Sequence, residues 1–357
     1  MTIFSDPTFF LLVTLAKVAV ILFVLLTAIA YITWLERKVV AHIQSRWGPY
    51  RVGPHGLLQP MADGIKFLFK EDIMPLEADR LIYLLAPFLA FTLAFLSFAV
   101  VPFGGSFQIG SRTIFLQVTN LDVGLLFIFA VTSLGVYSIA LAGWSSNSKY
   151  PLFGGLRSSA QMISYELSLG LAVIGVIMFS GTLNLRDMVM AQQGTWHLHG
   201  TDTYIPHWNI FVQPIGFLVY FTAAIAETNR VPFDLPEGET ELVAGFHTEY
   251  SSLKFAMFFM SEYANMITVS CIATLLFFGG WSGPGLGMTA PGALALLSIF
   301  WFAAKVFLFL FFYIWMRGTL PRFRYDQLMS FGWKVLLPVG FLNILVTGFI
   351  LTWWTSS

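Results

Sequence analysis

Long runs of hydrophobic residues alternate with shorter polar segments along the whole chain. A helix that crosses the hydrocarbon core of a bilayer needs about 20 predominantly apolar residues. Eight segments come close to this length, and the segment at 210–226 is the shortest of them. We therefore predict one membrane domain, 1–357, of an all-α, polytopic integral membrane protein. Its eight transmembrane helices are expected at about 9–34, 81–103, 123–144, 162–181, 210–226, 255–278, 291–316 and 335–354.

The basic residues predict how these helices cross the membrane. If the loop after the first helix is cytoplasmic, only Arg112 and Arg186 fall outside, and Lys17 and Lys305 lie within spans. The other 15 of the 19 Lys and Arg residues then face the cytoplasm. Cytoplasmic loops of membrane proteins carry such an excess of positive charge. We therefore expect both termini on the side away from the cytoplasm, which is the periplasmic side if the membrane is a bacterial inner membrane.

Residues 57–70, between the first two spans, show the pattern of an amphipathic helix. Met61, Ile65 and Leu68 recur on one face, while Asp63 and Lys66 lie on the other. The segment is too short to span a bilayer, so we predict a helix on the cytoplasmic side. Two interpretations stay open: the helix rests on the lipid surface, or it roofs a lateral opening in the membrane domain.

Composition narrows the possible functions. Hydrophobic residues make up 57% of the chain and charged residues 11%, whereas soluble domains are about 25% charged. The formal net charge is zero, so no bulk charge attracts nucleic acid, and we expect no such partner. The chain has one cysteine, Cys271, which excludes an iron-sulfur cluster held by four of its own cysteines.

Two carboxylates lie inside predicted spans. Glu166 falls in the fourth span and Glu262 in the sixth. A charge at the centre of a membrane helix costs about 2.5 to 3.5 kcal/mol on insertion scales. Such residues usually face a bundle interior or water. We interpret them as parts of a proton path, and the alternative is a structural hydrogen-bonded pair.

The cytoplasmic loop at 227–253, between the fifth and sixth spans, is acidic. Like charges held close together share protons, which suits a proton relay. The alternative is a solvated acidic loop, but Pro232 and Phe233 favour a folded segment. The six carboxylates are Glu227, Asp234, Glu237, Glu239, Glu241 and Glu249.

Two other cytoplasmic segments are basic. Arg46 and Arg51 lie among glycines and prolines that form tight turns and can fix them in place. Arg317 opens a second basic and aromatic segment. By composition alone, both segments could also be anchors that only orient the protein in the membrane.

The outer segment at 182–209 contains the sequence His197-Leu-His199. This spacing could bind a metal, but no carboxylate or thiol pattern completes the site, so we predict a solvated loop and no metal site. The sequence Gly283-Pro-Gly-Leu-Gly follows no strand, and we therefore expect no nucleotide to bind there.

Several motifs occur in order through nearly the whole chain. They include Glu36-Arg-Lys, Arg51-Val-Gly-Pro, Leu58-Gln-Pro, Glu227-Thr-Asn-Arg, Pro232-Phe-Asp-Leu, Glu241-Leu-Val-Ala-Gly, Glu262-Tyr and Pro321-Arg-Phe-Arg-Tyr-Asp-Gln. Together they resemble the NuoH family, the quinone-site membrane subunits of the proton-translocating NADH:quinone oxidoreductases, or respiratory complex I. A set of ordered motifs is far more specific than any one of them.

The resemblance implies a function. A subunit of this kind forms much of the quinone-binding chamber and couples quinone reduction to proton translocation. It implies quinone as the substrate and no cofactor in this chain, with FMN and iron-sulfur clusters in partner subunits. The expected partners are the other membrane and peripheral subunits of complex I and the membrane lipid.

The resemblance also implies site residues. Those expected along the quinone path are Arg37, Arg46, Asp63, Lys66, Arg230 and Arg317. Those expected in the proton relay are Glu36, Glu166, Glu227, Asp234, Glu237, Glu239, Glu241, Glu249 and Glu262. Two alternatives remain at this point: an equivalent subunit of a related membrane-bound hydrogenase-type complex, and an independent proton-coupled transporter.

Overall fold

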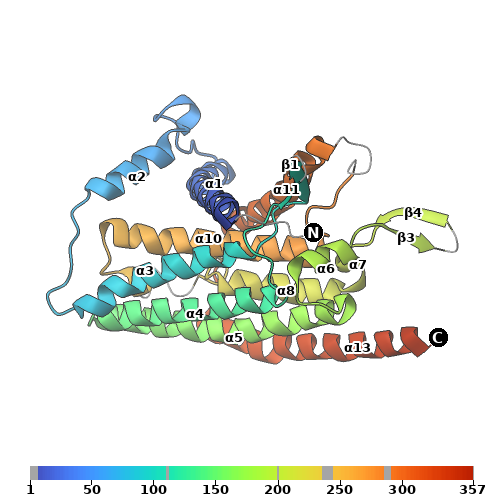
Figure 1. Ribbon diagram of the computed structural model, residues 1–357. Coiled ribbons are helices and arrows are strands. Elements are labelled where there is room, and N and C mark those ends of the chain that lie inside the picture. Colours follow the sequence, from blue (N-terminus) through green and yellow to red (C-terminus); the bar gives the residue numbers. More distant parts are fainter. Residues whose placement is uncertain (1–6, 110–111, 199–200, 235–243, 285–290, 357) are drawn as a thin grey trace.

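The computed structural model describes residues 7–109, 112–198, 201–234, 244–284 and 291–356 (Figure 1). Within these ranges seven helical segments are long and apolar enough to cross a membrane, as an all-α polytopic membrane protein requires. They are α1 (Pro7–Ile43), α3 (Arg80–Leu96), α4 (Gly124–Ser145), α5 (Lys149–Ser180), α10 (Ser252–Phe277), α11 (Pro291–Thr319), and α12 (Tyr325–Phe331) continued through the π-helical turn η4 (Gly332–Leu336) into α13 (Leu337–Ser356).

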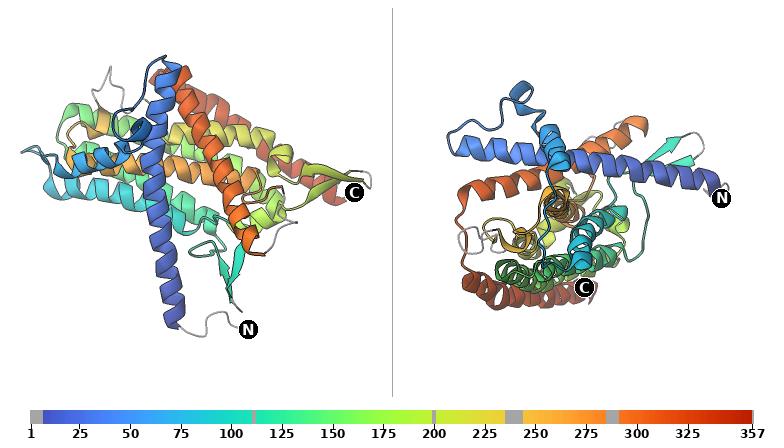
Figure 2. Two further views of the ribbon diagram at one scale, coloured as in Figure 1. Left: turned by 90° about the horizontal axis from the view of Figure 1, so that it is seen from above. Right: turned by 90° about the vertical axis from the view of Figure 1, so that its left-hand side faces the viewer.

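The helices form a bundle with two helices laid across it. In Figure 1, α3, α4, α5 and α10 run side by side, with α13 along one side of the bundle. Close packing joins α3 to α4, α4 to α5, and α5 to both α8 (Pro214–Glu227) and α13. Figure 2 shows α1 and α11 crossing the bundle at a slant on the side away from α13. These two helices pack on each other, and both contact α10.

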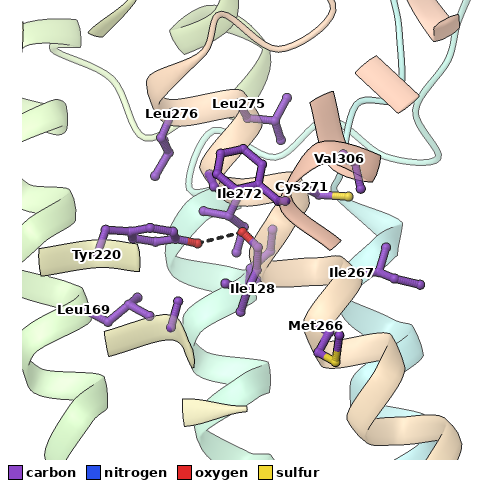
Figure 3. Close-up of a cluster of buried hydrophobic side chains, with 14 of the residues drawn as sticks. Ile128, Leu169, Tyr220, Met266, Ile267, Cys271, Ile272, Leu275, Leu276 and Val306 are labelled. Atoms are coloured by element: carbon purple, nitrogen blue, oxygen red, sulfur yellow. Dashed lines mark hydrogen bonds between the residues drawn. The ribbon is translucent and has the colours of Figure 1, made fainter. Parts of the chain in front are cut away.

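Helix α10 is the centre of the hydrophobic core. In its most apolar stretch 67% of the residues are buried, against 6% for α1. Leu275 and Leu276 are fully buried and belong to the same hydrophobic cluster as Ile128 of α4 and Leu169 of α5 (Figure 3). The Tyr220 hydroxyl of α8 donates a hydrogen bond to the Val269 carbonyl at 2.9 Å. This bond gives a buried polar group its partner and fixes α8 against α10.

Two helices extend beyond their predicted spans. Helix α1 continues to Ile43, so Glu36 and Arg37 lie on the helix and not in a loop. Helix α5 begins at Lys149, well before the predicted start at 162. The hydropathy pattern did not predict this first part of α5 because its buried side includes Ser158 and Gln161, which are polar. At its other end, Gly181 adopts the left-handed conformation (φ 65°) that ends many helices.

The shortest predicted span, 210–226, is interrupted. Helix α7 (Asn209–Val212) ends before Pro214, and α8 runs over 14 residues from there. Proline disfavours a helical conformation in the residue before it, and Gln213 has non-helical angles (φ −123°, ψ 52°). The Gln213 side chain binds Asn343 and Thr347 of α13 at 2.9 and 2.7 Å. The break therefore supplies a polar contact that holds α13 to the bundle.

Two short hairpins add strands to a chain expected to be all helical. β1 (Ser106–Ile109) pairs antiparallel with β2 (Arg112–Phe115), and β3 (Thr195–Leu198) pairs antiparallel with β4 (Thr201–Pro206). The second hairpin and α6 (Leu185–Ala191) occupy much of the segment predicted as a solvated loop. The two hairpins are rich in threonine and aromatic residues, which favour extended backbone.

Helix α2 (Gln59–Phe69) lies apart from the bundle (Figure 1). It falls within the segment predicted as amphipathic, 57–70. The structure describes α2 in full, and none of its residues is buried. It follows the 3-10 turn η1 (Pro54–Gly56), and two further 3-10 turns lie at η2 (Ser97–Ala99) and η3 (Gly245–His247).

Candidate functional site

Charged residues from three parts of the chain meet at Glu36. This side chain of α1 is only 3% exposed. Its carboxylate accepts hydrogen bonds from Arg317 of α11 and, at 2.5 Å, from the hydroxyl of Tyr263 of α10. Arg230, which follows α8, approaches the same carboxylate at 3.5 Å. A buried carboxylate needs partners of this kind because desolvation of an unpaired charge is costly.

Arg230 connects two carboxylates. Its Nη1 atom lies 3.5 Å from Glu36 and its Nη2 atom 4.0 Å from Glu262. The guanidinium also lies over the ring of Tyr263, 4.2 Å from the ring centre. The planar guanidinium has five donors in a fixed fork, so it can serve both acids at once. We call Glu36, Arg230, Glu262, Tyr263 and Arg317 the ion cluster.

A pocket of about 570 Å³, which we call the outer pocket, opens beside the ion cluster. It is lined by Glu36, Arg37, Val40, Arg46, Gly48, Pro49, Phe259, Tyr263 and Arg317. Nearby, Asp63 of α2 binds Arg37 at 2.8 Å and Lys66 at 3.5 Å. The Arg37–Asp63 pair joins α2 to α1 beside this pocket.

The turn that bears Arg46 is held by Lys38. The Lys38 ammonium donates to the carbonyls of Pro49 and His55 at 3.0 and 2.9 Å. Gly56 closes the turn with a positive φ of 79°, and a Cβ there would meet the Pro49 carbonyl oxygen at 2.2 Å. Only glycine fits this position. The turn is thereby fixed at the side of the pocket.

A small cavity of about 30 Å³, which we call the inner cavity, lies between α3, α4, α5, α8 and α10. Glu227 and Glu262 both line it, together with Thr132, Thr228 and Asn265. Such polar linings can hold water. The cavity is therefore a small, partly polar space inside the bundle.

Glu166 is not among the residues that line this cavity. Its carboxylate accepts a hydrogen bond from Ser133 of α4, which follows the cavity-lining Thr132 in the sequence. Glu166 and Glu227 are close enough for their charges to interact.

The first part of the acidic loop is folded against the bundle. Asp234 is buried and binds Arg322 at 3.2 Å. The Gln161 amide donates to the carbonyls of Ala226 and Phe233, each at 2.8 Å. These contacts fit the interpretation of a folded segment better than that of a solvated loop. The middle of the loop, with Glu237, Glu239 and Glu241, lies outside the described residues.

The last part of the loop packs on α3. Tyr83 donates a hydrogen bond from its hydroxyl to the Glu249 carbonyl at 2.7 Å. Its ring stacks on Tyr250, with ring centres 4.2 Å apart. Burial raises the pKa of Tyr250 to about 12, so this hydroxyl stays protonated beside Ser145. Glu249 thus lies at the α3 side, whereas Glu227 lines the inner cavity.

The structure regroups the residues expected from the sequence. Arg37, Asp63 and Lys66 form one surface cluster. The residues Arg230 and Arg317, expected on the quinone path, bind Glu36, which is expected in the proton relay. The two sets of residues therefore meet in the ion cluster.

Sequence reasoning missed Tyr263, Ser133 and Arg322 as members of the site. Tyr263 directly follows Glu262, and Ser133 directly follows Thr132. Each therefore lies beside another polar residue in a predicted span, which is the signal that could have found them. Arg322 was visible only as one of several basic residues. Its partner Asp234 is 88 positions away in the sequence, and local patterns do not predict such a contact.

The two lysines inside predicted spans bind backbone carbonyls. Lys17 donates to Gln117 at 3.0 Å. Lys305 donates to Phe278, Gly280 and Ser282 at 2.6, 2.9 and 2.6 Å, just beyond the end of α10. Both lysines therefore stabilise the backbone segments that they bind. In the part of the chain that the structure describes, no group of three or more His, Cys, Asp or Glu could hold a metal ion.

Comparison with known proteins extends over nearly the whole chain. The family model described as NADH dehydrogenase matches residues 16–348. The NADH-quinone oxidoreductase H subunit numbered 2 of Koribacter versatilis (strain Ellin345) is 59% identical over 350 residues, which cover 95% of this chain and 96% of that protein. The H subunit numbered 1 of Solibacter usitatus (strain Ellin6076) is 52% identical, with 97% and 98% covered. The H subunit of Thermomicrobium roseum (strain ATCC 27502 / DSM 5159 / P-2) is 53% identical, with 94% of each chain covered. Because these matches extend from α1 into α13, the chain belongs to the family of NADH-quinone oxidoreductase H subunits and is a membrane subunit of an oxidoreductase complex.

Proposed function

We propose that this subunit forms much of the quinone chamber of its complex and couples quinone reduction to proton translocation. The main support for this proposal is the series of ionisable groups between the outer pocket and the inner cavity. Glu36 faces the outer pocket, Arg230 bridges Glu36 and Glu262, and Glu262 shares the inner cavity with Glu227. A charge change at one end of such a series alters the proton affinity of the next group.

The proposed topology has eight transmembrane helices, with α7 and α8 as the fifth. Both termini face the periplasm of a bacterial inner membrane, as the distribution of basic residues favours. Arg46 and Arg51, on the turn between α1 and α2, then lie on the cytoplasmic side. The peripheral subunits of the complex would dock there, and the other membrane subunits would adjoin the bundle.

The proposed substrate is a quinone that enters from the bilayer. Its apolar tail lies beside α2, and its head occupies the pocket lined by Arg37, Arg46 and Glu36. Reduction to quinol takes up two electrons and two protons. FMN and the iron-sulfur clusters that deliver the electrons belong to partner subunits, while this chain supplies position and electrostatics.

Proton coupling follows from the position of Arg230. When the charge in the pocket changes, the balance of attraction between Arg230 and its two carboxylates changes too. A stronger contact with Glu36 weakens the contact with Glu262, which then binds a proton more readily. Glu227 and Glu166 would receive the proton next and pass the change on to neighbouring membrane subunits.

Substitution of Arg230 in the assembled complex tests the proposal. Arg230→Gln removes the charge that both carboxylates share, and we expect quinone-dependent NADH oxidation to fall by about tenfold or more, the effect of losing a buried charge partner. Arg230→Lys keeps the charge but not the fork, so it should retain an intermediate rate. NADH oxidation with a soluble electron acceptor reports on assembly and should be unchanged.

A matched control is Arg186→Gln. Arg186 lies over the Phe115 ring, 3.7 Å from its centre, outside the ion cluster. This variant should keep the wild-type rate with quinone. Wild-type quinone reduction and proton translocation in the Arg230→Gln complex would refute the proposed function.

A further inference from the structure

The start of α10 holds the end of α2. Ser252 is buried, and its hydroxyl lies 2.9 Å from the carbonyls of both Phe67 and Lys70, between which it shares its one proton. Phe67 is in the last turn of α2, and Lys70 follows the helix. The last carbonyls of a helix have no partner within the helix. Ser252 therefore supplies a partner from another element.

Two neighbours strengthen this attachment. The Ile73 amide donates to the Ser251 hydroxyl oxygen at 2.9 Å, and that hydroxyl donates to the Ile73 carbonyl at 3.2 Å. Lys254 binds Asp72 at 2.9 Å. Each of the three side chains thus binds the segment that leaves α2. We call Ser251, Ser252 and Lys254 the clasp.

The backbone at the clasp is constrained. Ser252 has a positive φ of 54°, which is uncommon for a residue with a side chain. Such conformations persist where surrounding contacts require them. The conformation turns the Ser252 hydroxyl toward α2, while the backbone enters α10.

The clasp also continues the acidic loop. Tyr250, directly before it, stacks on Tyr83 of α3. The Lys254 ammonium lies over the same Tyr83 ring, 4.8 Å from its centre. One short stretch therefore ties together the end of the acidic loop, α3 and the end of α2.

Helix α2 depends on such contacts because it buries little of its own surface. Helix α2 has no buried residue, and Met61, Ile65 and Leu68 are exposed. Its packing partners include α1 and α10. Because hydrophobic packing fixes it so weakly, the hydrogen bonds at its end and the Arg37–Asp63 pair near its middle set its position relative to Arg37, which lines the outer pocket.

We propose that the clasp of Ser251, Ser252 and Lys254 positions α2 and thereby sets the access of the long apolar tail of quinone to the pocket. This inference rests on the proposed function, in which the tail lies beside α2. Ser251, Ser252 and Lys254 are positioning residues, since they touch α2 and not the quinone head. The property that they control is selectivity for tail length.

The test uses Ser252→Gly in the intact complex in membranes. Glycine accepts the positive φ without strain, so this variant removes the hydroxyl and keeps the backbone path. We expect the KM for a quinone with a long isoprenoid tail to rise by about tenfold, as loss of shared hydrogen bonds implies. The KM for a short-tailed analogue and both kcat values should be unchanged.

A second readout follows α2 directly. Spin labels at Met61→Cys and Leu81→Cys, both exposed positions, should show a broader distance distribution when Ser252→Gly is present. The matched control is Ser180→Ala, whose hydroxyl binds only carbonyls of its own helix among the contacts described; it should alter neither readout.

An unchanged distance distribution, or an equal change in KM for long and short tails, would overturn the clasp. Failure of the proposed function is a separate result, because it appears as wild-type quinone reduction in Arg230→Gln. The label distances test the clasp whatever the Arg230 variants do.

Discussion

The buried charges near the two ends of α10 have different kinds of binding partner. Beyond Phe277, the Lys305 ammonium donates to three backbone carbonyls. Toward Ser252, Glu36 is surrounded by Arg317, Arg230 and the Tyr263 hydroxyl. A charge bound by backbone has partners that cannot change their charge. A charge bound by other ionisable groups responds when one of them gains or loses a proton.

Gln192, an uncharged residue at the Lys305 end of α10, is also bound by backbone groups. Its amide donates to the carbonyls of Met188 and Leu275 at 3.1 and 2.8 Å. Its oxygen accepts from the backbone of Asn209 and Gly279 at 3.3 and 3.0 Å. The side chain joins α6, α7 and the end of α10 through four bonds to backbone. The Lys305 end of α10 is therefore a fixed structure, and the Glu36 end is an adjustable one.

The largest effect is expected for Glu36→Gln. This variant leaves Arg230 and Arg317 without their shared negative partner, and breaking a buried pair costs about 3 to 5 kcal/mol. We expect quinone-dependent NADH oxidation to be nearly abolished, while a soluble acceptor still supports NADH oxidation. A wild-type rate with quinone would contradict the proposal that the charges around Glu36 respond to one another during quinone reduction.

Lys305→Met should instead reduce stability and leave catalysis intact. It removes three charge-assisted hydrogen bonds of about 1.5 to 3 kcal/mol each in typical cases, although the methionine recovers part of the packing. We expect a lower melting temperature and less assembled complex, with unchanged quinone reduction per assembled complex. The exposed Lys149→Met is the control and should leave both unchanged. Loss of turnover in fully assembled Lys305→Met would contradict the view that Lys305 has only a structural role.

The smallest effect is expected for the Arg37–Asp63 pair. Arg37 is 51% exposed and Asp63 20%, and exposed pairs contribute about 0.2 to 1 kcal/mol. A double-mutant cycle with Arg37→Gln and Asp63→Asn should give a coupling in this range, measured as the KM for quinone. The coupling should weaken at high salt. If the coupling free energy of Arg37 with Asp63 were as large as that of Glu36 with Arg230, the contacts that respond to charge would lie at α2 and not at Glu36.

Much of the fold could be predicted because apolar length is a local property. The spans of α3, α4 and α10 begin or end within a few residues of the prediction. The start of α5 was missed because buried Ser158 and Gln161 find distant hydrogen-bond partners such as Asn229 and the Phe233 carbonyl. Such contacts are not visible in a hydropathy pattern.

The site was predictable as a set of residue types and not as an arrangement. Acidic and basic residues could be assigned to separate roles, yet the contact of Glu36 with Arg317 joins positions 281 apart. Tyr263 gains its importance only because α1 brings Glu36 to its hydroxyl. Long-range packing decides these contacts, and one sequence does not encode them as a local pattern.

The most direct measurement is the number of protons translocated per electron in Glu227→Gln membranes. Glu227 lines the inner cavity but does not line the outer pocket, so a neutral residue there should interrupt the proton path while leaving the quinone site in place. We expect a lower ratio of protons to electrons, with quinone reduction still measurable. The exposed Glu77→Gln should keep the wild-type ratio. A wild-type ratio and rate in Glu227→Gln would contradict the claim that these carboxylates of the bundle interior couple quinone reduction to proton movement.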